Sequence, residues 1–329
     1  MKIISKIANA VIIAVLVLGV SSCGSDDDGN IIIPTDNIVV TATADTDLSL
    51  LVAALAAADG DLVSVLSGTG PFTVLAPTDE AMQAYLTANN YADIAAIPTG
   101  ELQQLLLNHV IPGEVSSTTL TNNGAGYTAT SSTAGPAGAT ISIYYNTTSG
   151  VVFNGVSTVT TPDITASNGI IHKVNAVIGL PDVTTFATAD PNFSRLVEGL
   201  NAYSFDYVAT LQGNGPFTVF APNNTAFDAL LATNTDWNTP ADIEETALTT
   251  ALNIHVIPNE NIREADLTDG NVTTLSGQIT VDTVASTVTD GANPANVAAI
   301  IATDVQATNG VIHMIDKVLL TPIEIISGR

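Results

Sequence analysis

Apolar and polar positions follow a helical period in one recurring part of the chain. The segment ELQQLLLNHV carries apolar residues every three or four positions, and a histidine shares their face: Leu102, Leu105, Leu106, His109 and Val110. This spacing is typical of an amphipathic helix that packs one side against a core. Because proline lacks a backbone N–H, Pro112 predicts the end of that helix.

Other segments favour strands and turns. FTVLAP, residues 72–77, is a short β-prone run stopped by Pro77, after which Thr78 or Asp79 can cap a helix. The stretch 115–159 is rich in Thr, Ser and Gly and predicts several hairpin strands. The segment NGIIHKVNAVI begins with an Asn-Gly turn and then alternates, which predicts a strand with one face made of Ile170, His172, Val174, Ala176 and Ile178.

Each of these patterns occurs twice. The repeated segments are GPFTVLAPTDEAM and GPFTVFAPNNTAF, LNHVIPGE and NIHVIPNE, and ASNGIIHKVNAVI and ATNGVIHMIDKVL. Their offsets of 145, 146 and 141 residues correspond to a whole domain, since solenoid repeats have much shorter periods. The sequence therefore predicts two tandem domains, residues 37–180 and 181–322, followed by a C-terminal tail, 323–329.

The N-terminal segment predicts an exported, lipid-anchored protein. Residues 1–22 combine two lysines with an apolar run too short for a comfortable membrane span, which is typical of a signal peptide. The small residues that lead into Cys23 resemble the lipobox of bacterial lipoproteins. An acidic tract, Asp26–Asp28, follows in a flexible tether, 23–36, and resembles the surface-export signal of Bacteroidota lipoproteins. We therefore expect that the protein is lipidated at Cys23 and located on the outer membrane, exposed at the cell surface.

Composition excludes several functions. The 329 residues include 7 basic and 32 acidic side chains, and the net charge of −25 opposes binding to nucleic acid or anionic membrane surfaces. Cys23 is the only cysteine, which excludes an intramolecular disulfide and a cysteine-based zinc site. Serine-nucleophile motifs and phosphate-binding glycine loops are absent from the sequence, so we expect no enzyme activity and no cofactor.

The three repeated motifs resemble the fasciclin (FAS1) domain in both copies and in the same order. The resemblance implies an α+β fold with two tandem FAS1-like domains, each a β-sandwich or wedge with several packed helices. It also implies extracellular adhesion without a cofactor. In animal members an Asp-Ile pair ahead of the last motif is linked to integrin binding. The matching positions are a candidate adhesion motif: Asp163, Ile164, Asp304 and Val305.

The four histidines of the chain all fall within these repeats: His109, His172, His255 and His313. A neutral imidazole can donate one hydrogen bond and accept one, and so tie a helix end or a turn to a strand. A metal site would need a third and usually a fourth ligand, and histidine spacings typical of metal sites do not occur in the sequence. We therefore interpret the histidines as structural, with metal binding as the alternative and catalysis as a weaker one.

Two functions fit these observations. The first is a surface-anchored, non-enzymatic adhesion or binding module for an extracellular protein or polysaccharide. The alternative is an accessory subunit of an outer-membrane β-barrel protein complex. The sequence does not identify the ligand, the oligomeric state, the domain that binds or any bound Ca²⁺.

Overall fold

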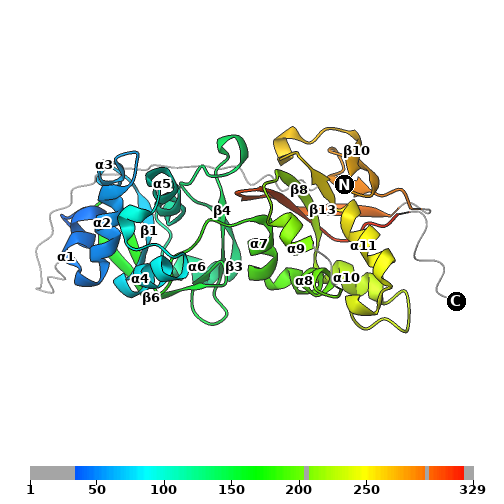
Figure 1. Cartoon of the computed structure of the whole chain (residues 1–329), viewed down its shortest axis with the longest axis horizontal. Coiled ribbons are helices and arrows are strands. Elements are labelled where there is room, and N and C mark those ends of the chain that lie inside the picture. Colours follow the sequence, from blue (N-terminus) through cyan, green and yellow to red (C-terminus); the bar gives the residue numbers. More distant parts are fainter. Residues whose placement is uncertain (1–33, 204–206, 293–295, 322–329) are drawn as a thin grey trace, which may run out of the picture. The chain divides into compact units, whose positions relative to one another are not determined.

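Each half of the chain folds around one seven-stranded β-sheet with helices packed against it (Figure 1). The structure is a computed structural model that describes residues 34–203, 207–292 and 296–321. Cys23 and the predicted signal peptide, 1–22, lie outside these residues. The α+β prediction with two tandem domains is confirmed. Within the described ranges, no single helix is long and apolar enough to cross a membrane.

The first domain contains the strands β1 Phe72–Pro77, β2 Val110–Pro112, β3 Ala125–Ala129, β4 Ser142–Asn146, β5 Val152–Phe153, β6 Ser157–Ala166 and β7 Gly169–Val174. Its α-helices are α1 Ile38–Ala44, α2 Ser49–Ala57, α3 Leu62–Leu66, α4 Asp79–Ala88, α5 Thr99–Asn108 and α6 Ser117–Asn123. Short 3-10 turns are η1 Thr46–Leu48, η2 Ile94–Ala96 and η3 Pro136–Gly138.

The second domain repeats this plan with the strands β8 Phe217–Pro222, β9 Val256–Pro258, β10 Gly270–Thr274, β11 Gly277–Asp282, β12 Thr287–Thr289, β13 Val297–Ala307 and β14 Gly310–Ile315. Its α-helices are α7 Val183–Ala189, α8 Ser194–Leu200, α9 Tyr207–Leu211, α10 Asn224–Leu231 and α11 Glu245–Ile254. The 3-10 turns are η4 Pro191–Phe193, η5 Pro240–Asp242 and η6 Glu264–Asp266.

The two sheets have the same topology. Their strand orders are β2-β1-β7-β6-β5-β4-β3 and β9-β8-β14-β13-β12-β11-β10. The central pairs β1–β7 and β8–β14 are parallel, and the other strand pairs are antiparallel. In each sheet the two edge strands meet at one end. The Ser131 N–H donates to the Val110 carbonyl at 2.7 Å, and the Leu275 N–H donates to the Val256 carbonyl at 3.0 Å.

Both faces of each central strand pair are buried. Successive residues of β1 alternate between two apolar clusters: Val74 packs with the helices α1–α5, and Leu75 packs against β4 and β5 on the other face. The strand predicted over residues 170–178 ends at Val174, so Ala176 and Ile178 lie beyond it. Within β7, Ile171 is buried along with Ile170 and His172. A strand between a parallel and an antiparallel neighbour in a covered sheet has no solvent face.

Two local predictions need correction, and one is confirmed. The helix α5 ends at Asn108, before Pro112, because Val110–Pro112 pairs with β1 as a strand. The helix α6 lies within residues 115–159, where the sequence predicts several hairpin strands. Thr78 caps α4 as predicted, and its hydroxyl accepts from the Ala81 N–H at 3.3 Å.

Candidate functional site

His109 and His255 lie at the ends of α5 and α11 and tie these helices to the last segment of each domain. The His109 Nε2 accepts from the Ile178 N–H at 2.9 Å, so its Nδ1 carries the proton and donates to the Leu105 carbonyl at 2.8 Å. His255 repeats this arrangement with Leu319 N–H at 2.9 Å and the Ala251 carbonyl at 2.6 Å. Both ring nitrogens of each histidine therefore have backbone partners.

Burial keeps these two imidazoles neutral. It lowers the pKa of His109 to about 4 and that of His255 to about 4, with a smaller opposing effect of the backbone hydrogen bond. Neither ring is available as an acid–base group near neutral pH, because both nitrogens are occupied and the charged form is disfavoured.

His172 and His313 occupy the central strands β7 and β14. The His172 Nδ1 accepts from the Asp163 N–H at 3.1 Å, and its Nε2 donates to the Val115 carbonyl at 2.9 Å. The His313 Nε2 donates to the Ile262 carbonyl at 2.8 Å, but its Nδ1 is buried without a hydrogen-bond partner in the described part of the chain. Burial lowers the pKa of His313. Within the described residues, no group of three or more His, Cys, Asp or Glu side chains could hold a metal ion.

The candidate motif residue Asp163 lies in an irregular part of β6 with a left-handed backbone, at a φ of 57°. Its carboxylate accepts from the Ser117 N–H at 2.9 Å and from the Ser117 hydroxyl, at the start of α6. Partial burial opposes ionisation, but these bonds hold the pKa of the Asp163 carboxyl below its ordinary value. Ile164 is partly buried against the core of the first domain.

The second copy of the motif keeps this geometry. Asp304 has a φ of 61°, and its carboxylate accepts from the Glu264 N–H at 2.7 Å and from the Arg263 guanidinium at 3.2 Å. Val305 is buried in the core of the second domain. The Asp163 carboxylate thus fixes the segment after β2, and the Asp304 carboxylate fixes the segment after β9. An external partner of either carboxylate would have to compete with these donors.

Asn168 and Asn309 each hold three segments of their domain together, a role that the predicted Asn-Gly turn did not include. The Asn168 Oδ1 accepts from the Ile38 N–H at 2.9 Å, and its Nδ2 donates to the carbonyls of Leu66 at 2.8 Å and Gly68 at 2.7 Å. Asn309 makes the equivalent three bonds in the second domain. Their signal was present in the sequence, since an Asn-Gly pair precedes both final strands.

The glycine of that pair is required by close packing. A Cβ on Gly169 would lie 2.0 Å from the Phe72 carbonyl oxygen, where β7 begins beside β1. Any larger residue would force the parallel pair apart. The Asn-Gly repeat therefore reports a backbone requirement as well as a turn.

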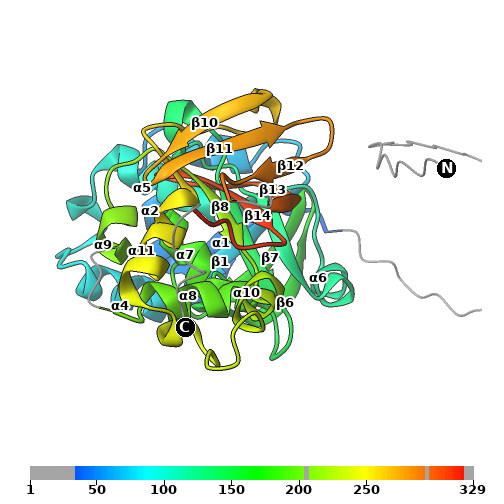
Figure 2. The same ribbon diagram turned by 90° about the vertical axis from the view of Figure 1, so that its right-hand side faces the viewer.

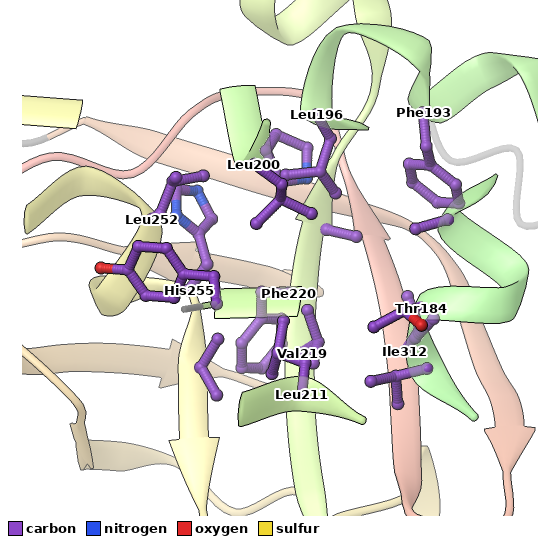
Figure 3. A pocket seen from close by; sticks show the side chains of 16 residues that line it. Thr184, Phe193, Leu196, Leu200, Leu211, Val219, Phe220, Leu252, His255 and Ile312 are labelled. Carbon is purple, nitrogen blue, oxygen red and sulfur yellow. The ribbon is translucent and has the colours of Figure 1, made fainter. Parts of the chain in front are cut away.

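A small cavity lies in the core of the second domain, between α7, α8 and β8 (Figure 3). Its walls are almost entirely apolar, with Phe193, Leu196 and Val219 among them, and the His255 ring contributes to its lining. The cavity volume is about 40 Å³. Ligand pockets are typically about 300–1,000 Å³. The cavity is therefore a packing defect and is too small for a ligand.

Replacing Asp163 separates its structural contribution from a direct adhesive one. Asp163→Ala is expected to lower the free energy of unfolding by about 2 kcal/mol, because it removes both acceptors of Ser117 at the start of α6 and leaves Ala in a left-handed conformation. Asp163→Asn keeps an acceptor for Ser117 and tolerates that conformation, so its cost should stay below about 0.5 kcal/mol. Urea unfolding of both variants checks this. Loss of adhesion in folded Asp163→Asn would show that the carboxylate itself contacts the partner.

Comparisons with known proteins agree with the duplicated fold. The fasciclin domain model matches residues 46–181 and 191–321. A Synechocystis protein, sll1483, is 38% identical over 140 residues, which cover 43% of this chain and 73% of that protein. Transforming growth factor-beta-induced protein ig-h3 of Sus scrofa is 28% identical over 265 residues, which cover 78% of this chain and 35% of that protein.

A FAS1 domain pair from the insect cell adhesion molecule Fasciclin I has been solved. It is 19% identical to this chain with a TM-score of 0.49, and the match covers 82% of this chain and 95% of the solved one.

Proposed function

This chain belongs to the fasciclin domain family, and on that premise we propose that it is a non-enzymatic adhesion or binding protein. Its partner is an extracellular protein or polysaccharide. The observation that supports binding over catalysis is the use of the conspicuous polar side chains within the fold. Each of the four histidines donates to a backbone carbonyl, and both motif carboxylates accept from backbone N–H groups.

We further propose that the protein is anchored in the outer membrane by lipid at Cys23 and is exposed at the cell surface. The support comes from the sequence, in which the only cysteine follows a short apolar run and precedes three aspartates. An acidic surface tether suits a protein that has to reach a partner outside the cell.

Cys23→Ala is expected to move the protein from the membrane fraction to the soluble fraction, because no acyl chain can then be attached. One acyl chain contributes about 0.8 kcal/mol per buried CH₂, so its loss removes most of the membrane affinity. Fractionation followed by immunoblotting measures this, with Ser25→Ala as a control that leaves the cysteine in place. Persistent membrane association of Cys23→Ala would contradict lipid anchoring.

A deletion strain provides the test of function. It should attach less to protein-coated or polysaccharide-coated surfaces, and wild-type protein should restore attachment while Cys23→Ala does not. Unchanged attachment by the deletion strain would refute the adhesion role. Stoichiometric recovery with an outer-membrane barrel protein, together with unchanged attachment, would indicate a subunit role.

A further inference from the structure

The two domains differ in how they cover the open edge of their sheets. In the first domain the helix α6 packs against the edge strand β3 (Figure 1), and its Leu120 is only 2% exposed within the core. In the second domain the corresponding segment forms only the short turn η6, which contributes no buried residue. The edge strand β10 therefore lacks the helix that covers its counterpart.

A groove of about 590 Å³ lies beside β10. This volume is within the range of ligand-binding sites. Its lining comes from the segment after β9 and from β10 itself: Glu260, Asn261, Ile262, Asp266, Leu267, Thr268, Asn271, Val272 and Thr273. Ile262, Leu267 and Val272 are partly buried and give it an apolar floor. Polar side chains form the rest of the lining.

The groove is lined by β10 and by the chain after β9. Just beyond β10 the Leu275 N–H donates to the Val256 carbonyl of β9 at 3.0 Å. Figure 2 shows β10 at the margin of the sheet, outside β11. Since β10 pairs with β11 on one side only, the other side of residues 271–273 faces the groove. An exposed strand edge of this kind can pair with an added extended peptide.

Charge selects among such peptides. The carboxylates of Glu260 and Asp266 lie at the groove on exposed residues. The nearest basic side chain in sequence, Arg263, is bound to Asp304 at 3.2 Å. The chain as a whole carries a net charge of −25. Basic side chains at alternating positions of a bound strand would lie on one face and could pair with these carboxylates.

We propose that this groove binds an extended segment of a partner protein, added as a strand beside β10, with basic side chains directed at Glu260 and Asp266. The inference rests on the proposed binding function and names its site and partner class. The first domain differs at this place, because the corresponding segment forms the helix α6, which contacts β3.

A labelled ten-residue peptide of alternating Thr and Lys tests the site by fluorescence anisotropy with the full chain at physiological salt. A Pro-Lys peptide of the same length and charge is the control, because it lacks half of the backbone donors and does not pair as a strand. The Thr-Lys peptide is expected to bind at least tenfold more tightly. Equal binding of both peptides would show that charge attraction alone causes the binding, without strand pairing, and would overturn the proposal.

Variants locate the binding. Glu260→Lys combined with Asp266→Lys should weaken binding of the Thr-Lys peptide at least tenfold. Glu114→Lys, at the position equivalent to Glu260 in the covered domain, should weaken it less than twofold. Thermal unfolding verifies that the variants are folded. Equal losses in the groove and Glu114 variants would overturn the assignment.

Failure of this inference is distinguishable from failure of the proposed function. The wild-type protein could instead bind a neutral soluble glucan and no peptide, and lose the glucan in the groove variant, Glu260→Lys with Asp266→Lys. That result would make the groove a polysaccharide site and overturn the peptide assignment. Cells with the groove variant that attach normally, beside a deletion strain that does not, would overturn the groove and leave the adhesion role standing. A deletion strain that attaches like wild type would refute the adhesion role itself.

Discussion

Acidification from pH 7 to pH 4 is expected to remove roughly 3 kcal/mol of unfolding free energy for each of His109 and His255. The pKa of both rings is lowered from 6.5 to about 4 in the folded protein. One pKa unit corresponds to about 1.4 kcal/mol. Both side chains are nearly inaccessible, at 2% and 3% exposure, so solvent screening reduces this effect little. Native domains are typically stable by only about 5–15 kcal/mol, which makes this a large change.

The sign follows from proton binding. Below pH 6.5 the unfolded chain binds a proton at each of these histidines, while the folded chain does so only near pH 4. Stability is therefore fully present above pH 6.5 and is lost progressively as the pH falls through the folded pKa. The buried ring of His313, whose pKa is also lowered, acts in the same direction. The carboxyl groups with lowered pKa, such as that of Asp163, lose their contribution at still lower pH.

Urea unfolding at pH 7, 5.5 and 4.5 measures the slope. The double variant His109→Gln and His255→Gln should be less stable at pH 7 but should lose much less stability between pH 6.5 and 4. An unchanged slope in this variant would show that other groups are responsible for the acid sensitivity.

Asn168→Ala is expected to lower the free energy of unfolding by about 4 kcal/mol. The substitution leaves three backbone groups without their partner: the Ile38 N–H and the carbonyls of Leu66 and Gly68. Each unsatisfied buried group costs about 1–3 kcal/mol, with some relief from water that enters. These groups belong to the first helix, to α3 and to the turn that follows it, so the loss loosens three segments together.

Chemical denaturation of Asn168→Ala and Asn309→Ala measures the effect in the two domains, which should be similar. Asn168→Asp keeps the acceptor for the Ile38 N–H but loses both donated bonds and buries a charge. Its free energy of unfolding should therefore lie well below that of wild type. The exposed Asn122→Ala should change stability by less than about 0.5 kcal/mol. A cost below about 1 kcal/mol for Asn168→Ala would show that water replaces the side chain.

The duplication explains why the fold was predictable. Three motifs in the same order in both copies identify two domains, and the Thr78 cap follows from local sequence alone. Boundaries that depend on partners distant in sequence were missed. Val110 follows a helical pattern, yet it pairs with Val74 as a strand. The helix α6 was missed because its Ser-Thr-Thr and Asn-Asn content favours turns, and burial of Leu120 against the sheet overrides that preference.

The candidate site was predictable only in part. The histidine faces followed from periodicity, but the tautomers and partners depend on contacts such as His109 with Ile178, which is 69 residues away. The hydrogen bonds from Ser117 to the Asp163 carboxylate likewise depend on the start of α6, 46 residues away in sequence. The groove beside β10 had no sequence signal of its own, because it arises where a helix present in one copy is missing from the other.

The hydrogen bond that joins the two edge strands of each sheet also bears on misfolding. Tandem domains of similar sequence can exchange strands during folding, and free strand edges promote such exchange and fibre growth. Ser131 with Val110, and Leu275 with Val256, tie the edges within each domain. In the second domain residues 271–273 of the short strand β10 line the groove, so this edge fits one short added strand better than an extended intermolecular sheet. These two bonds leave fewer unpaired backbone groups through which the two similar domains could exchange strands.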